Sequence, residues 1–174
     1  RVAAITNRYG ALTGYTIRVG RYFESIALPL REVLLEPKAS IALFGPPGSG
    51  KSTLVRSVVA MLAEEYGPRL CVVDSSNEIA GDGDTPHYLL KSARRLQVSD
   101  PEQLAAKLIE ALINHGPAVM VVDELARPSE VKNIIRIVQR GVRVIACLHG
   151  DTIEEIVRTP DYAPLLGMSE GQRN

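Results

Sequence analysis

The chain has 174 residues, 45% of them hydrophobic and 23% charged, and its 20 basic residues balance its 20 acidic ones. This length suits one hydrophobic core of ordinary size and is short for two domains. A net charge of zero gives no long-range attraction to a polyanion, so binding of nucleic acid would need a local basic patch. No apolar run reaches the length of a membrane span and no signal-peptide pattern is present, so we expect no membrane insertion.

Residues 1–37 differ in character from the rest of the chain. Val2–Ile5 and Tyr15–Val19 are rich in strand-forming residues, and turn-forming residues at 7–10 separate them, which predicts a β-hairpin. A short helix or linker over 29–37 should lead into the core. We therefore divide the chain into an N-terminal element (1–37), a core (38–167) and a polar tail (168–174), and we expect a piece of a longer protein because the sequence begins with Arg1.

From residue 39 onward, short apolar runs alternate with helical periods. This pattern is typical of an α/β fold with a parallel sheet and helices on both faces. The runs predict strands over 39–44, 70–74, 118–122 and 142–148, and helices over 51–66, 100–115 and 129–140, with a short helix opening at 152. The stretch 75–91 has many turn-forming residues and no clear period; loops of this length are usually functional or mobile. Cys71 and Cys147 lie in two of the apolar runs, which indicates buried thiols in a reducing compartment, here the cytoplasm.

A phosphate-binding loop lies between the first core strand and the first core helix. It consists of Gly45, Pro46, Pro47, Gly48, Ser49, Gly50, Lys51 and Ser52, followed by Thr53. The glycines leave room for backbone N–H groups around phosphates, and the helix that begins near Lys51 adds its unpaired donors and its positive dipole end. Lys51 would reach the β- and γ-phosphates, and Ser52 would hold Mg²⁺. The loop thus predicts ATP and Mg²⁺ as cofactors.

Hydrolysis needs a second acidic site near the metal and the attacking water. Asp123 and Glu124 follow an apolar run, which places them at the carboxyl end of a buried parallel strand, where ligands bind in open α/β sheets. We expect Asp123 to hold Mg²⁺ through water and Glu124 to act as general base. The alternative is a helix cap followed by a surface acid.

Three more polar residues follow strands at the same sheet edge. His149 closes the last strand and could sense the terminal phosphate, although a structural role is as plausible. Asp74 and Glu78, around the end of the second core strand, could face the water or the metal, or belong to an ordinary polar loop.

Basic residues suggest two further roles. His87, Lys91, Arg94 and Arg95 form a local cluster that is a solvated face, a contact to a polyanion, or the source of an arginine that acts on a neighbouring subunit. An arginine finger supplied by a neighbouring subunit is often needed for hydrolysis. The candidates are Arg127, Arg136, Arg140 and Arg143, with Arg140, at a helix end, favoured.

On these motifs the chain resembles the P-loop ATPases related to stage III sporulation protein AA, above all their cyanobacterial and plastid relatives. The resemblance rests on the phosphate loop, on Ser76-Asn77-Glu78-Ile79 with the glycine–aspartate loop after it, on Ala93–Val98, on Asp123-Glu124, and on 140–150. It implies a RecA-like core similar to those of secretion and pilus motors, which usually form rings, often hexamers. It also gives weight to Glu78 and His149, and leaves open whether Glu124 or Glu78 is the base. A plastid stroma would be the location in a photosynthetic eukaryote.

These features favour a Mg²⁺-dependent ATPase that works as a ring-forming motor and a homo-oligomer. Two alternatives remain at this stage: an ATP-gated switch with slow turnover that docks a protein partner, and a translocase or helicase that moves single-stranded nucleic acid. Loss of hydrolysis with retained ATP binding in Glu124→Gln would separate a motor from a switch. Stimulation of the ATPase by single strands, falling with salt, would reveal a translocase.

Overall fold

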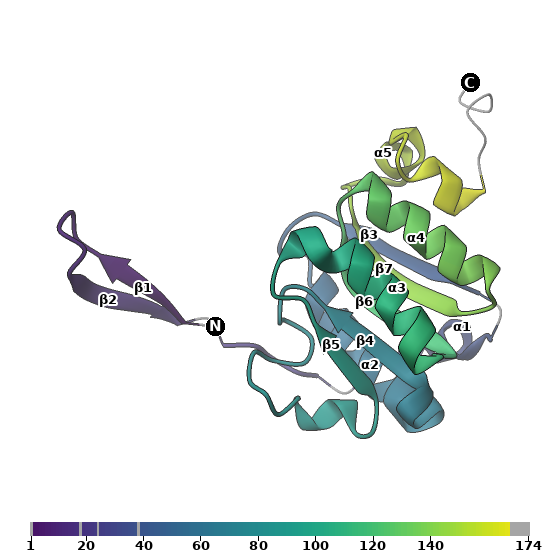
Figure 1. Ribbon diagram of the computed structural model, residues 1–174, viewed down its shortest axis with the longest axis horizontal. Coiled ribbons are helices and arrows are strands. Elements are labelled where there is room, and N and C mark those ends of the chain that lie inside the picture. Colours follow the sequence, from purple (N-terminus) through teal and green to yellow (C-terminus); the bar gives the residue numbers. More distant parts are fainter. Residues whose placement is uncertain (1, 18, 24, 38, 168–174) are drawn as a thin grey trace.

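The computed structural model describes residues 2–17, 19–23, 25–37 and 39–167. Figure 1 shows a core with a central sheet between helices and a β-hairpin that stands away from it. The predicted tail over 168–174 lies outside the described residues. The strands are β1 (Val2–Thr6), β2 (Leu12–Ile17), β3 (Ile41–Gly45), β4 (Leu70–Asp74), β5 (Arg94–Gln97), β6 (Val119–Leu125) and β7 (Arg143–His149). The helices are α1 (Arg31–Leu35), α2 (Lys51–Tyr66), α3 (Leu104–His115), α4 (Pro128–Gln139) and α5 (Ile153–Arg158).

The core sheet is parallel, with the strand order β3-β7-β6-β4-β5. Its central strands are apolar on both faces because both faces are covered. In β6, Met120 and Val122 pack on the side of α3 and α4, whereas Val119 and Val121 pack on the side of α2. Continuous apolar runs of this kind are the sequence pattern of a doubly covered parallel sheet, and the α/β prediction is confirmed.

The strand β5 was not predicted. Its sequence, Arg94-Arg95-Leu96-Gln97, carries one buried apolar side chain, Leu96, because β5 is an edge strand that pairs only with β4. Charged residues are common on edge strands because they discourage pairing with other chains. The apolar pattern alone could not reveal this strand, because its two arginines are typical of a polar surface.

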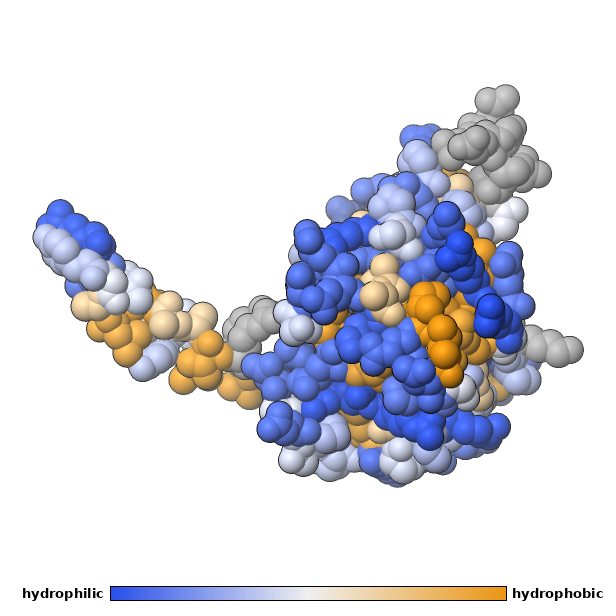
Figure 2. All heavy atoms as spheres, in the orientation of Figure 1, coloured by the Kyte–Doolittle hydropathy of each residue, from blue (hydrophilic) through white to orange (hydrophobic). Residues whose placement is uncertain are grey.

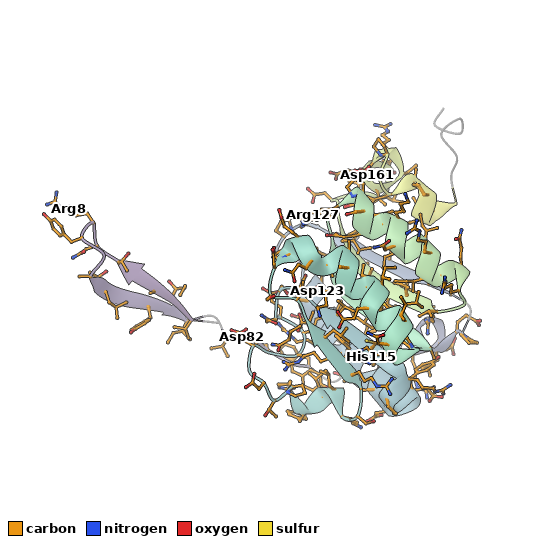
Figure 3. The ribbon with its side chains drawn as sticks, in the orientation of Figure 1. Arg8, Asp82, His115, Asp123, Arg127 and Asp161 are labelled. Atoms are coloured by element: carbon orange, nitrogen blue, oxygen red, sulfur yellow. The ribbon has the colours of Figure 1, made fainter. Side chains whose placement is uncertain are left out.

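The hairpin is present as predicted, with β1 and β2 antiparallel and paired from Val2–Ile17 to Thr6–Leu12. The side chain of Asn7 shapes its turn by accepting hydrogen bonds from the amides of Tyr9 (2.9 Å) and Ala11 (3.0 Å). Arg8 lies at the tip of the hairpin, far from the labelled residues of the core (Figure 3). Apolar residues stay exposed along the ribbon, among them Val2, Tyr15 and Ile17 at 63%, 60% and 68% (Figure 2).

Arg143 anchors α1 to the sheet. The residue is 4% exposed, and its guanidinium donates to the carbonyls of Ala39 and Leu34 and to that of Val33 at 3.1 Å. These carbonyls lie at the C-terminal end of α1 and just before β3, where a short helix leaves its last acceptors unpaired. Arg143 is therefore a structural residue, and we withdraw it from the candidates for an arginine finger.

We expect Arg143→Met to lower the free energy of unfolding by about 3 kcal/mol, because it leaves three carbonyls without their charged donor. Urea denaturation at neutral pH measures the change. Arg140→Met, at an exposed position, is the matched control and should change stability by less than about 0.5 kcal/mol. Equal effects of the two substitutions would contradict the anchoring role.

Candidate nucleotide-binding site

One cleft, of about 720 Å³, lies at the carboxyl edge of the sheet. Because β3, β4, β6 and β7 are parallel, the residues that follow all four strands meet there. The lining residues that were predicted from sequence are Pro47, Gly48, Gly50, Lys51, Ser52, Thr53, Glu78, Asp123, Glu124 and His149. Its volume lies within the range of small-molecule sites. The acidic residues thus lie on the same side of the sheet as the phosphate loop.

Two glycines of the phosphate loop adopt backbone conformations that favour glycine. Gly48 (φ +79°) and Gly50 (φ +95°) adopt left-handed conformations that other residues rarely take. Gly50 is also the N-cap of α2, and no side chain caps this helix end, so the amides of its first turn remain available to an anion. The ammonium of Lys51 donates to the carbonyls of Gly45 and Pro46, the latter at 3.0 Å. A polyanion would compete with these two carbonyls for the same charge.

Asp123 joins the ends of two neighbouring strands. Its carboxylate accepts hydrogen bonds from the hydroxyl of Ser75 (2.7 Å) and the amide of Ser76 (2.6 Å), both just beyond β4, and from the amide of Glu124 (2.9 Å). Figure 3 labels its position in the core. The carboxylate of Glu124 contacts Nε2 of His149 at the end of β7. A carboxylate and an imidazole from adjacent strands thus meet inside the cleft.

Glu78 reaches across to the phosphate loop. Its carboxylate accepts a hydrogen bond from the hydroxyl of Ser52 at 2.9 Å. The carbonyl of Glu78 accepts a hydrogen bond from Nε of Arg56, one helical turn beyond Ser52. The loop after β4 is therefore held against α2 at the residue that the motif assigns to Mg²⁺.

Asp74 does not face the cleft, contrary to the possibility that we raised from sequence. Its side chain is fully buried and accepts hydrogen bonds from the amides of Ile79 (3.2 Å) and Ala80 (2.8 Å). Burial raises the pKa of Asp74 to about 6, and the nearby Asp123 carboxylate adds to the rise, while the two amides oppose it. The sequence pattern correctly predicts that Asp74 lies at the carboxyl edge of the sheet. It does not show whether the side chain lies in the cleft or is buried beneath the following loop.

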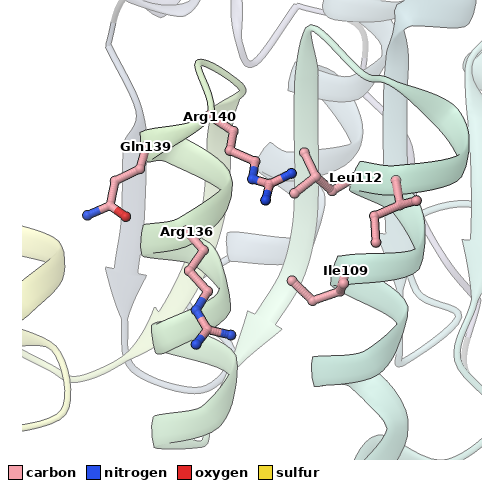
Figure 4. A pocket seen from close by; sticks show the side chains of 6 residues that line it. Ile109, Leu112, Arg136, Gln139 and Arg140 are labelled. Atoms are coloured by element: carbon pink, nitrogen blue, oxygen red, sulfur yellow. The ribbon is translucent and has the colours of Figure 1, made fainter.

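Arg140 and the phosphate loop lie at opposite ends of the sheet. The helix α4 runs from the carboxyl edge back to the amino edge, and Arg140 follows its last turn. Its side chain lines a groove of about 380 Å³ between α3 and α4, opposite Ile109 and Leu112, with Arg136 one turn away (Figure 4). The guanidinium of Arg127 contacts the Pro101 carbonyl at 3.1 Å. None of these arginines lines the cleft of its own chain.

The predicted basic cluster consists of side chains with partners inside the protein. Lys91 pairs with Glu64, and Arg94 donates to the His115 carbonyl at 2.6 Å. Arg95 donates to the carbonyls of Gly81 (3.0 Å), Gly83 (2.7 Å) and Asp84 (3.0 Å), and the His87 ring packs at 4.4 Å from that of Tyr88. These contacts favour a structural role for the cluster over a polyanion contact.

Sequence reasoning missed one part of the cleft wall, and for another it left open, at Arg21, a solvated strand face or a contact to bound nucleotide. The first is Arg56, and the second is the segment from Val19 to Phe23, which leads from the hairpin toward α1. Nη1 of Arg56 donates to the Arg21 carbonyl at 2.9 Å, so one guanidinium ties this segment and the loop of Glu78 to α2. Arg56 follows Ser52 by one helical turn, and this spacing indicates that both residues lie on the same face of α2.

Both cysteines are buried, as predicted, and both are free thiols. Burial raises the pKa of each to about 12, so the reactive thiolate form is suppressed at neutral pH. Cys147 is among the residues that line the cleft.

Over the described residues, no three or more His, Cys, Asp and Glu side chains are grouped to hold a metal. None of the helices described combines the length and apolar character needed to cross a membrane.

The fold and the loop define the class: a RecA-like P-loop ATPase fold preceded by a small antiparallel hairpin. The family "Sporulation stage III, protein AA" matches residues 12–173. The chain therefore belongs to the family of stage III sporulation protein AA, as its motifs suggested.

Two curated relatives are of particular use. Protein SEEDLING PLASTID DEVELOPMENT 1 of Arabidopsis thaliana is 42% identical over 96% of this chain and 24% of its own length. Stage III sporulation protein AA of Bacillus subtilis is 30% identical over 88% of this chain and 52% of its own length. The chain thus spans about a quarter and about half of these two proteins.

Solved structures share the fold at lower identity. The ATPase DotB of Legionella pneumophila has a TM-score of 0.60 and 22% identity, with 90% of this chain and 44% of DotB covered. The pilus retraction motor PilT with bound ADP has a TM-score of 0.55 and 22% identity, with 82% and 40% covered. At this identity the likeness establishes the fold.

Proposed function

We propose that the chain binds ATP with Mg²⁺ and hydrolyses it. The observation that carries this proposal is one cleft that is lined both by the phosphate loop and by the acidic residues Glu78, Asp123 and Glu124, with Asp82 also in its wall. Support also comes from DotB, which is named an ATPase, and from PilT, whose structure contains ADP. The polar ends of four parallel strands meet only at this edge, which is where α/β sheets bind their ligands.

The residues of the cleft fit a triphosphate and Mg²⁺. The N-terminus of α2 and the ammonium of Lys51 would hold the phosphates, and the hydroxyl of Ser52 would contact the metal. Asp123 would hold a water of the metal, since its carboxylate is already fixed by Ser75 and Ser76. Hydroxyl and carboxylate oxygens are the ligands that Mg²⁺ prefers, and the metal would neutralise charge on the phosphates.

We assign different roles to the two glutamates. Glu78 contacts Ser52, so it would orient water on the metal side of the cleft. Glu124 lies near the end of β6 and contacts the histidine of β7 inside the cleft, so we propose it as the general base that accepts the proton of the attacking water. His149 would hold Glu124 until nucleotide is bound and act as the sensor residue.

Glu124→Gln should bind ATP normally and lower kcat by at least about 100-fold, because glutamine cannot accept a proton. Glu78→Gln should retain measurable turnover but need a higher Mg²⁺ concentration for half-maximal rate. Single-turnover hydrolysis, with the free Mg²⁺ concentration varied, measures both. If Glu78→Gln abolishes turnover at every Mg²⁺ concentration while Glu124→Gln retains it, the two roles are reversed. If the parent protein does not hydrolyse ATP at all, the proposed function is wrong.

We further propose that the chain assembles into a ring, with the hairpin as a contact between copies. Residues 1–23 contain four arginines and no acidic residue. The remaining sixteen basic residues face twenty acidic ones, so the rest of the chain carries a net charge of about −4. A two-stranded ribbon is at best marginally stable in water, and both faces of this one are exposed. The acidic core of a second copy would cover the apolar side chains of the hairpin and offset its positive charge. In such an assembly, an arginine such as Arg140 could serve as the arginine finger for the nucleotide site of a neighbouring copy.

Assembly can be tested on Glu124→Gln, which should keep its nucleotide. Its mass, measured by light scattering after size exclusion, should rise from that of a monomer to that of a closed oligomer when Mg²⁺ and ATP are added. Adding Tyr15→Ser and Ile17→Ser, which remove apolar cover on one face of the hairpin, should prevent the shift. Thr16→Ser, on the opposite face, is the control. A ring that forms equally well without Tyr15 and Ile17 would contradict the role of the hairpin.

The remaining predictions from sequence stay proposals. We treat residues 38–167 as the ATPase core and residues 1–37 as the N-terminal element. The name of the Arabidopsis relative refers to plastid development, which supports the plastid stroma as one location, with the cytoplasm as the other.

A further inference from the structure

We propose that Asp74 is a positioning residue: its buried carboxylate fixes the chain after β4 and thereby places Glu78 beside Ser52. The inference rests on the proposed function for the importance of Glu78, and it assigns no contact with nucleotide to Asp74 itself.

The first observation is the burial of a charged group. Asp74 ends β4 and has no exposed surface. A carboxylate in such a place is costly unless hydrogen bonds compensate for the lost water. Two backbone amides, those of Ile79 and Ala80, donate to Oδ2 at 3.2 and 2.8 Å, and the Asp123 carboxylate lies beside the same side chain. The side chain therefore holds the chain five and six residues further on.

The second observation is the path of the chain between these points. Asn77 has a left-handed backbone (φ +56°), which is uncommon outside glycine. The turn at Asn77 brings Ile79 and Ala80 back over the end of β4, where both are buried. Glu78, the residue between the turn and the anchored amides, remains half-buried and directs its carboxylate at Ser52, 2.9 Å away. The anchor thus acts on the residues immediately after Glu78.

The other contacts of this loop hold groups that Asp74 does not touch. Arg95 holds its outer part through the carbonyls of Gly81, Gly83 and Asp84. The Asn77 side chain donates to Asp82 at 2.9 Å. Arg56 holds the carbonyl of Glu78 from the side of α2. From the sheet, Asp123 holds Ser75 and Ser76 before the turn at Asn77. Asp74 holds the amides after the turn, so its loss should be felt at Glu78 more than at the loop tip.

Three variants test the inference. Asp74→Leu keeps the branched arrangement of side-chain heavy atoms and suits a buried position, although it is larger, and it cannot accept hydrogen bonds. Asp74→Asn keeps a carbonyl oxygen that can take the place of Oδ2. Arg95→Met is the matched control, because it releases the outer loop and does not line the cleft. Each variant is compared with the parent by hydrogen–deuterium exchange and by ATPase kinetics.

In Asp74→Leu, exchange at Ile79 and Ala80 should speed up at least about tenfold, the value of one lost charge-assisted hydrogen bond. Its kcat should fall about 10- to 100-fold and its half-saturating Mg²⁺ concentration should rise, because Glu78 is misplaced. KM for ATP should change by less than about threefold, since the phosphate loop is untouched. Asp74→Asn should restore protection and kcat to near the parent values, whereas Arg95→Met should loosen 81–84 and leave kcat almost unchanged.

Several results would overturn the inference. One is unchanged exchange at Ile79 and Ala80 in Asp74→Leu. Another is faster exchange there with parent values of kcat and Mg²⁺ requirement. A third is an equal loss of kcat in Arg95→Met, which would assign the effect to general loop order. If the parent protein lacks ATPase activity, the proposed function fails, and the exchange data alone still decide whether Asp74 anchors the loop. If Asp74→Leu does not fold, loss of protection and kcat in Asp74→Asn despite its carbonyl would contradict the inference.

Discussion

The hydrogen bonds of Asp123 to Ser75 and Ser76 are the contacts on which the cleft depends. They join the ends of β6 and β4, two neighbouring strands that the chain reaches about fifty residues apart. On one side of this junction Glu78 meets Ser52 of the phosphate loop, and on the other Glu124 meets His149. Four segments thus form one polar site because parallel strands end at a common edge.

Much of this arrangement could be predicted from the sequence, for identifiable reasons. A phosphate loop needs glycines and lysine at fixed spacing, so Gly48, Gly50 and Lys51 are readable without coordinates. Apolar runs that end in acids fix the position of Asp123 and Glu124 along their strand, and the parallel topology then brings them to the loop. The same reasoning recovered the helices, because their apolar faces follow the helical period.

Other features could not be predicted because their cause is tertiary. The strand β5 carries two arginines whose partners, among them the carbonyls of Gly81 and Gly83, come from another segment. Asp74 and Asp123 are both acidic residues that follow apolar runs in neighbouring strands, yet Asp74 is buried under a loop and Asp123 lines the cleft. Arg143 resembled a functional arginine and is an anchor for α1. Local sequence gives the position of a residue along a strand, but not what covers it.

The central claim is that the cleft binds a triphosphate between the first turn of α2 and the acidic residues Asp123 and Glu124 of β6. Calorimetric titration with ATP in the presence of Mg²⁺ tests it most directly, with the parent protein compared to Lys51→Ala. Loss of one charge-assisted contact to phosphate should weaken binding at least about tenfold while the fold is retained. Equal affinity of Lys51→Ala and the parent, or no binding by the parent, would contradict the account.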